Sequence, residues 1–236
     1  MYIGPQGIVH GTTLTLMNAG RKIDPKNKTL NGKIFITSGL GGMSGAQSIA
    51  AVIAGVSCII AEVDPDAIRQ RLEDGYILTE NIYTDLASLF EHARTHSGGG
   101  KGIALVYAGN IVEVWEYAAQ HDIRVDLGSD QTSLHNIDDL GYCPVGYRFD
   151  EAKVLLRENK LKFMEEVRHS LRRHVAAINK LASKGMYFWD YGNAFLKEAG
   201  ESGADIWKDE KSGEYRYASY VEDIMGPLCF DYGFGP

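Results

Sequence analysis

Residues 33–64 constrain the fold of this chain more than any other segment. The apolar run Lys33 to Ser38 enters the glycine-rich stretch Gly39-Leu40-Gly41-Gly42-Met43-Ser44-Gly45, and a second apolar run, Val56 to Ala61, delivers Glu62. Glycines after a strand permit a tight turn, because they tolerate positive φ, and they let the backbone approach a pyrophosphate without a Cβ in between. The order of strand, glycine turn, helix and strand therefore predicts a βαβ unit that binds a dinucleotide.

The residues after the glycine turn supply the other parts of such a site. An alanine-rich helix follows, and its N-terminus would point free N–H groups and the positive end of its dipole at the phosphates. Glu62 follows Gly41 at the expected spacing of about 20 positions and could accept both ribose hydroxyls. A carboxylate there favours NAD over NADP. The third glycine of the fingerprint falls on Ser44, with Gly45 one residue late, so an ordinary glycine loop remains the alternative for the turn alone.

Composition excludes several classes of protein. The chain has 236 residues, of which 44% are hydrophobic and 23% charged, as in a soluble globular protein of one domain or slightly more. Its net charge of −7 disfavours nucleic acid or an anionic membrane as a partner. No apolar run approaches the roughly 20 residues that span a bilayer.

The cysteines and the chain ends bear on its compartment and completeness. Cys58, Cys143 and Cys229 are odd in number and lack metal-ligand spacing, which is typical of free thiols in a reducing cytosol. The first residues have neither a charged segment nor an apolar segment of a signal peptide. Both ends are rich in glycine and aromatic residues, and we interpret the chain as a fragment with a cytoplasmic location.

Apolar strands alternate with helical patterns along most of the chain. This alternation predicts an α/β fold, a Rossmann-like doubly wound parallel sheet with helices on both faces. Beyond residue 64 we expect strands at 102–108 and 123–127, and helices at 65–74, 81–96, 111–121 and about 150–183. The segment 202–215 is polar and is expected at the surface.

Three further polar motifs follow expected strands or helices. They are Gly109-Asn110, Asp130-Gln131-Thr132-Ser133-Leu134-His135 and Asp190-Tyr191-Gly192-Asn193. Because ligands of open parallel sheets bind beyond the carboxyl ends of the strands, we expect these motifs to surround the same crevice as the glycine turn.

With these motifs in order, the sequence closely resembles urocanase. The matching segments also include Tyr2-Ile3-Gly4-Pro5-Gln6-Gly7 near the start and Glu62-Val63-Asp64 after the second strand. The resemblance implies tightly bound NAD+ that acts as an electrophile rather than as a hydride acceptor, and addition of water to urocanate to give imidazolone propionate. It also implies a cytosolic homodimer. In such a protein, residues 29–210 would form the Rossmann-like domain, and 1–28 and 211–236 would belong to a second, incomplete core.

The resemblance also implies cofactor contacts, residue by residue. Two departures from the family pattern affect these contacts. The arginine that usually lies five residues after the ribose carboxylate is replaced by Ala67, with Arg69 or Arg71 as candidate substitutes. The segment 136–140 is one residue longer than in typical bacterial members of the family. The implied cofactor-binding residues are Gln6, Gly41, Gly42, Met43, Ser44, Glu62, Asn110, Ile111, Gln131, Thr132, Ser133, Leu134, His135, Tyr142, Cys143 and Tyr191.

The catalytic cysteine motif of the family, Arg-Asp-His-Leu-Asp-Cys, is absent from these residues. We therefore assign no catalytic residue and no metal ligand to this chain, and expect it to bind cofactor with little or no turnover. Cys58 and Cys143 are interpreted as packing thiols. His135 and His10 are each interpreted as structural rather than as an acid or base.

Two other functions remain open on the residues alone. One is an NAD-dependent oxidoreductase, which should show a paired acid and base such as a tyrosine with a lysine three or four positions later. Tyr142 and Tyr191 lack lysines at that spacing. The other is an NAD-binding module without catalysis.

Overall fold

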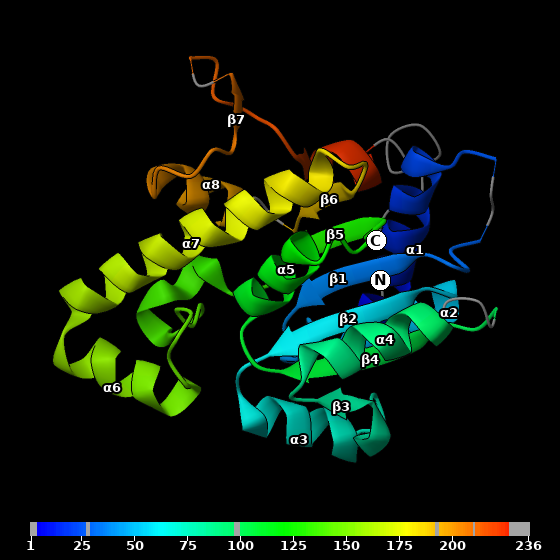
Figure 1. Cartoon of the computed structure of the whole chain (residues 1–236), viewed down its shortest axis with the longest axis horizontal. Coiled ribbons are helices and arrows are strands. Elements are labelled where there is room, and N and C mark those ends of the chain that lie inside the picture. The colour runs from blue at the N-terminus through cyan, green and yellow to red at the C-terminus, as the bar shows by residue number, and fades with distance from the viewer. Residues whose placement is uncertain (1–3, 27–28, 97–99, 192–193, 210, 227–236) are drawn as a thin grey trace.

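The structure is a computed structural model that describes residues 4–26, 29–96, 100–191, 194–209 and 211–226. Its centre is a seven-stranded sheet in the order β3-β4-β2-β1-β5-β6-β9, with every neighbouring pair parallel (Figure 1). The strands are β1 (Ile34–Ser38), β2 (Ser57–Glu62), β3 (Ile82–Tyr83), β4 (Ile103–Ala108), β5 (Leu127–Asp130), β6 (Tyr187–Asp190) and β9 (Ala218–Ser219). The predicted α/β class and parallel sheet are confirmed.

Helices cover both faces of this sheet, because successive residues of each strand enter different cores. Ile36 and Ile59 pack with α4 (Leu86–His96), α5 (Ile111–Gln120) and α7 (Lys160–Ala182). Phe35 and Ile60 pack instead with α1 (Pro5–Ile23) and α2 (Ala46–Ala54). In Figure 1 the first group of helices lies in front of the sheet and the second behind it. Strands buried on both faces explain the continuous apolar runs in the sequence.

The remaining helices flank the carboxyl edge of the sheet. They are α3 (Pro65–Glu73), α6 (Phe149–Glu158) and α8 (Ala194–Glu201), with 3-10 turns at Thr79–Asn81 and Leu134–Asp139 and a π-helix at Tyr220–Met225. Strands β7 (Trp207–Asp209) and β8 (Glu214–Tyr215) form a separate antiparallel hairpin within the segment expected at the surface. None of the helices in the described part of the chain is long and apolar enough to cross a membrane.

Two predicted elements are shifted or divided. The strand expected at 123–127 lies at Leu127–Asp130. Gly128 packs so closely against Trp115 that an added Cβ would lie 2.8 Å from the indole. This glycine is therefore a residue of the strand and does not form a turn. The helix expected at about 150–183 is broken at Asn159, whose backbone is not helical (φ −148°, ψ 78°). Asn159 caps α7 by accepting a hydrogen bond from the Lys162 N–H.

The helix expected at 81–96 begins later than predicted. Residues 79–83 form the 3-10 turn and the edge strand β3, and α4 begins at Leu86. Asp85 accepts a hydrogen bond from the Ser88 N–H at 2.8 Å, an N-cap contact that fixes this start.

The terminal segments contact each other and the sheet. Helix α1 packs on α2 and also touches the π-helix at 220–225, while β9 adds to the sheet beside β6. Their assignment to a second core domain, with boundaries at 28 and 211, stays a prediction.

Candidate functional site

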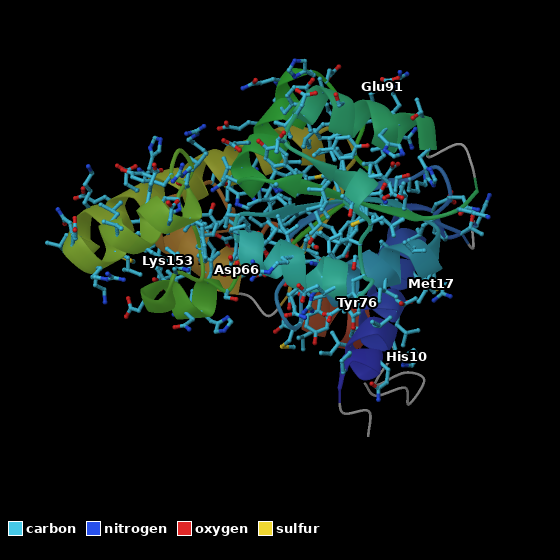
Figure 2. All side chains as sticks on the ribbon, turned by 90° about the horizontal axis from the view of Figure 1, so that it is seen from below. His10, Met17, Asp66, Tyr76, Glu91 and Lys153 are labelled. Carbon is cyan, nitrogen blue, oxygen red and sulfur yellow. The ribbon has the colours of Figure 1, made fainter. Side chains whose placement is uncertain are left out.

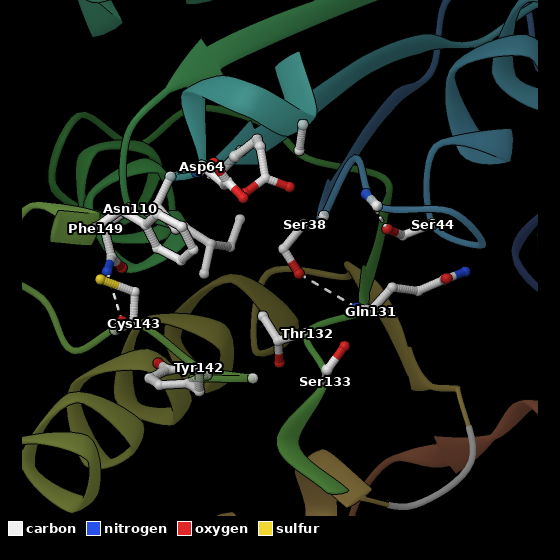
Figure 3. A pocket seen from close by; sticks show the side chains of 18 of the residues that line it. Ser38, Ser44, Asp64, Asn110, Gln131, Thr132, Ser133, Tyr142, Cys143 and Phe149 are labelled. Carbon is white, nitrogen blue, oxygen red and sulfur yellow. Dashed lines mark hydrogen bonds between the residues drawn. The ribbon is translucent and has the colours of Figure 1, made fainter. Parts of the chain in front are cut away.

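A pocket lies where the carboxyl ends of β1, β2, β4 and β5 meet at one edge of the sheet (Figure 3). Its cavity volume is about 200 Å³. The pocket lies at the topological switch point, since β1 is followed by β2 on one side and has β5 on the other. It is lined by Ser38, Gly39, Gly41, Ser44, Ala61, Glu62, Val63, Asp64, Ala67, Gly109, Asn110, Ile111, Gln131, Thr132, Ser133, Leu140, Gly141, Tyr142, Cys143 and Phe149.

The glycine turn forms one wall of this pocket. Gly39 has φ +90°, and a Cβ there would lie 2.8 Å from the Ser44 hydroxyl, so only glycine fits. The Gly41 N–H donates to the Ser44 hydroxyl at 2.8 Å. Within the described residues, the backbone N–H groups of Gly42, Met43 and Ser44 have no hydrogen-bond acceptor. Three free N–H groups before a helix N-terminus are suited to an anion such as a pyrophosphate.

Gly45 allows the close packing that the third glycine of the fingerprint usually allows, although it lies one residue later in the sequence. A Cβ on Gly45 would lie 2.7 Å from Cδ of Arg71 and 2.9 Å from the Gly41 carbonyl oxygen. The absent side chain therefore lets α2 start close to its own turn and to α3. This close approach accounts for the irregular spacing in the sequence.

Glu62 faces the turn from the end of β2. Its Oε2 accepts a hydrogen bond from the Leu40 N–H at 2.6 Å, and its Oε1 accepts one from the Asp64 N–H at 2.9 Å. Burial raises the pKa of Glu62 above its ordinary value, while these backbone donors oppose the rise. Each carboxylate oxygen keeps a second lone pair, so the group can also accept hydrogen bonds from a ribose.

Asp130 fixes the loop on the opposite wall. Its Oδ2 accepts a hydrogen bond from the Ser38 hydroxyl at 2.9 Å, and its Oδ1 accepts bonds from the Thr132 N–H and hydroxyl. The Gln131 N–H donates to the same Ser38 hydroxyl at 3.2 Å (Figure 3). Burial raises the pKa of Asp130. Residues 131–133 are thus tied to the end of β1 and present polar groups to the cavity.

Asn110 and Cys143 close one end of the pocket. The Asn110 Oδ1 accepts a hydrogen bond from the Val112 N–H at 2.9 Å, capping α5, and its Nδ2 donates to the Cys143 carbonyl at 2.8 Å. Burial raises the pKa of Cys143 to about 12, so the thiol stays protonated. Cys58 is fully buried in β2. Both thiols are buried, and their role as packing thiols stays a prediction. Cys229 lies outside the described residues.

Ten of the sixteen predicted cofactor residues line this pocket, and six do not. Gln6 is exposed on the first turn of α1, and His135 is exposed in the 3-10 turn after the β5 loop. Leu134 is buried, and Tyr191 packs between Trp189 and Tyr220. Gly42 and Met43 are exposed in the turn. Cofactor contacts of all sixteen stay predictions.

The arginine expected near the ribose carboxylate has no counterpart in the pocket. Ala67 lines the cavity at that position. Arg69 is exposed and pairs with Asp66 at 2.9 Å. Arg71 lies behind the turn and pairs with Asp74 at 2.8 Å. Neither candidate substitute therefore lines the pocket.

Sequence reasoning missed several lining residues. Ser38 and Val63 lie at strand ends, a signal that the strand pattern contained. Phe149 is different, because it reaches the pocket from the start of α6, about 85 residues after Val63 in the chain. No local pattern marks it.

Comparison with known proteins agrees with this geometry. Residues 4–224 match the family model described as the Urocanase Rossmann-like domain. The probable urocanate hydratase of Dictyostelium discoideum is 52% identical over 237 residues, which cover 100% of this chain and 34% of that protein. The urocanate hydratases of Mus musculus and Homo sapiens are 49% and 48% identical, each again over 100% of this chain and 35% of the relative.

A solved structure, L-tryptophan dehydrogenase from Nostoc punctiforme, is similar at a TM-score of 0.35 and 14% identity over 89% of this chain and 48% of that chain, too little to carry an argument. The chain spans about a third of the length of the curated relatives it matches. With the family model matching nearly its whole length, the chain belongs to the urocanase family and comprises its Rossmann-like domain.

Proposed function

We propose that this chain is the dinucleotide-binding part of a urocanate hydratase, a hydro-lyase that adds water to urocanate to give imidazolone propionate. The observation that carries the proposal is the identity of 48–52% along the whole chain with relatives named urocanate hydratase or probable urocanate hydratase. Those relatives are about three times as long as this chain. We therefore assign the cofactor site to this chain and the rest of the substrate site to other segments of the full-length protein.

The residues present fit NAD+. The free N–H groups of Gly42, Met43 and Ser44 would hold the pyrophosphate, and Glu62 would accept the hydroxyls of the adenosine ribose. Residues 131–133, tied down by Asp130, would face the nicotinamide half from the β5 side. When bound, NAD+ would supply an electrophilic ring for the imidazole of urocanate.

The contribution of this chain to the reaction is then binding and orientation. The hydrogen bonds of Ser38 and Asp130 hold the β5 loop in place before any ligand arrives, which lowers the entropic cost of positioning the reactants. The protonated thiol of Cys143 is a poor nucleophile, so it contributes packing rather than chemistry. The buried free thiols agree with a reducing cytoplasm, and we include a homodimeric parent protein in the proposal.

The test combines binding with turnover. Calorimetry should show NAD+ binding to this chain, and urocanate followed by its near-ultraviolet absorbance should be consumed slowly or not at all. Failure to bind NAD+ would refute the cofactor assignment. Rapid urocanate consumption would show that the substrate site is complete in these residues, and net reduction of NAD+ by an alcohol or hydroxy acid would favour an oxidoreductase.

A further inference from the structure

Three buried polar side chains form a hydrogen-bonded network at the base of the glycine turn. Thr37 comes from β1, Gln47 from the first turn of α2 and Ser129 from β5. All three are fully buried. Figure 2, by contrast, shows the charged side chains of Asp66 and Lys153 at the outside of the molecule. Burial of a polar group is unfavourable unless the group is hydrogen-bonded, so the partners of this network are informative.

The hydrogen bonds of this network run in one direction. The Thr37 hydroxyl donates to Gln47 Oε1 at 2.7 Å and lies 2.8 Å from the Ser129 hydroxyl. Because Thr37 gives its one hydrogen to Gln47, Ser129 is the donor to Thr37. Gln47 Nε2 donates to the Ser38 carbonyl at 3.1 Å and to the Gly39 carbonyl at 3.5 Å. A reversed amide would place Oε1 against two carbonyl oxygens, so the surroundings fix the orientation of the Gln47 amide.

This network connects the two walls of the pocket. Gln47 binds the two residues through which β1 passes into the glycine turn. Ser129 lies in β5, shortly before the loop that forms the opposite wall. The two walls come close here, since a Cβ on Gly39 would lie 3.2 Å from the Gln131 carbonyl oxygen. The position of the Gln47 amide therefore determines where the turn begins relative to the β5 loop.

Stability alone does not require polar side chains at these positions. Apolar groups of the same shape can replace a buried hydrogen-bonded set with little change in folding free energy. An apolar side chain cannot, however, hold two carbonyl groups at a fixed distance and direction. The Gly39 N–H is bonded to the Ala61 carbonyl at 2.8 Å, and the Gly39 carbonyl is held by Gln47. Together these bonds orient the backbone that leads into residues 40–44.

We propose that Gln47 is a positioning residue for the pyrophosphate of the dinucleotide. It is fully buried and does not line the pocket, so it acts through the backbone and not by contact with the ligand. By holding the Ser38 and Gly39 carbonyls, it keeps the turn in the arrangement that leaves the N–H groups of residues 42–44 free for the anion. The inference rests on the proposed function and deepens it.

The experiment measures the Kd of NAD+ by calorimetry for two variants across a range of pH. Gln47→Leu keeps a similar volume and loses every hydrogen bond, so its Kd should be raised about tenfold at every pH. Gln47→Glu keeps the shape, and its carboxyl can donate one hydrogen bond when protonated and none when ionised. Burial beside two carbonyl oxygens should raise the pKa of the new carboxyl. Its Kd should therefore lie within about threefold of the unaltered value at about pH 5.5 and approach that of Gln47→Leu at about pH 8.5.

Other charged groups also surround the turn, namely the carboxyl groups of Glu62 and Asp130 and the guanidinium of Arg71. Each affinity is therefore compared with that of the unaltered chain at the same pH. The matched control is Gln120→Glu, which adds the same charge at the exposed end of α5 outside the pocket and should leave the affinity unchanged. Urea denaturation of each variant shows whether a change in stability occurs without a change in affinity, as a merely structural role would produce.

Unaltered NAD+ affinity of both Gln47 variants in their folded state would overturn the inference. A loss of equal size in both variants at every pH would overturn it as well, because side-chain packing and not the donated hydrogen bonds would then be responsible. If neither variant folded, Thr37→Val would remove the hydroxyl that orients the amide; its Kd should rise about threefold, and an unchanged Kd would overturn the inference. If the unaltered chain bound no NAD+, the proposed function itself would fail.

Discussion

Replacing Gly42 with valine should separate ligand binding from folding. A Cβ at Gly42 meets no heavy atom within 4 Å, and its φ is not positive. The substitution thus adds a side chain at an exposed position of the turn without strain or overlap. We expect the free energy of unfolding to change by no more than about 0.5 kcal/mol, as for an ordinary surface position.

NAD+ binding should weaken strongly in the same variant. The branched side chain would stand beside the free N–H groups of residues 42–44, where a pyrophosphate must approach the backbone. Hydrogen bonds to charged groups contribute about 1.5–3 kcal/mol each. Loss of a single one corresponds to at least about a tenfold rise in Kd.

Two further glycine variants make the comparison sharper. Gly45→Ala would bring its Cβ to 2.9 Å from the Gly41 carbonyl oxygen, so it should lower both stability and affinity. Gly11→Ala in α1 meets no atom within 4 Å and lies outside the pocket, so affinity should be unchanged. Urea denaturation and calorimetry measure the two quantities. Wild-type NAD+ affinity in Gly42→Val would refute the pyrophosphate assignment, and unfolding of that variant would refute the packing argument.

Two other outcomes follow from the buried carboxyl groups. NADP+ should bind at least about tenfold more weakly than NAD+, because its 2′-phosphate meets the charge of Glu62. Glu62→Gln should bring the Kd values of the two cofactors closer together. Equal calorimetric affinities of the unaltered chain for NAD+ and NADP+ would contradict this prediction. Burial raises the pKa of Asp190 to about 7. The folded state therefore keeps a proton that the unfolded state releases near pH 4, so stability should fall between about pH 4 and pH 7, by up to about 4 kcal/mol, and level off above pH 7. In Asp190→Asn the free energy of unfolding, measured by urea denaturation, should change less with pH between about pH 4 and pH 7. An unchanged pH dependence would exclude Asp190 as its source.

The sequence by itself determined the central βαβ unit. Continuous apolar runs before and after a glycine turn are typical of parallel strands that are buried on both faces of a sheet between helices. β1, α2 and β2 lie where these runs predict them. Strand-end motifs likewise predicted that Glu62, Asn110 and Gln131 would meet at one edge. These features are local, because period, glycine position and spacing along the chain encode them.

Only the tertiary structure decided which side chains complete the site and where some elements begin. Gly128 is a strand residue because Trp115, from another element, packs against it, and Gly45 is required by Arg71 from the following helix. Phe149 lines the pocket because the start of α6 lies near the residues that follow β4, and no spacing rule contains that contact. Leu134 lies outside the pocket although the preceding residue, Ser133, lines it. Tyr191 also lies outside, because it packs between Trp189 and Tyr220. The physical reason is that a motif fixes backbone position along a strand, whereas packing across the sheet decides which side chains face the core and which face the cavity.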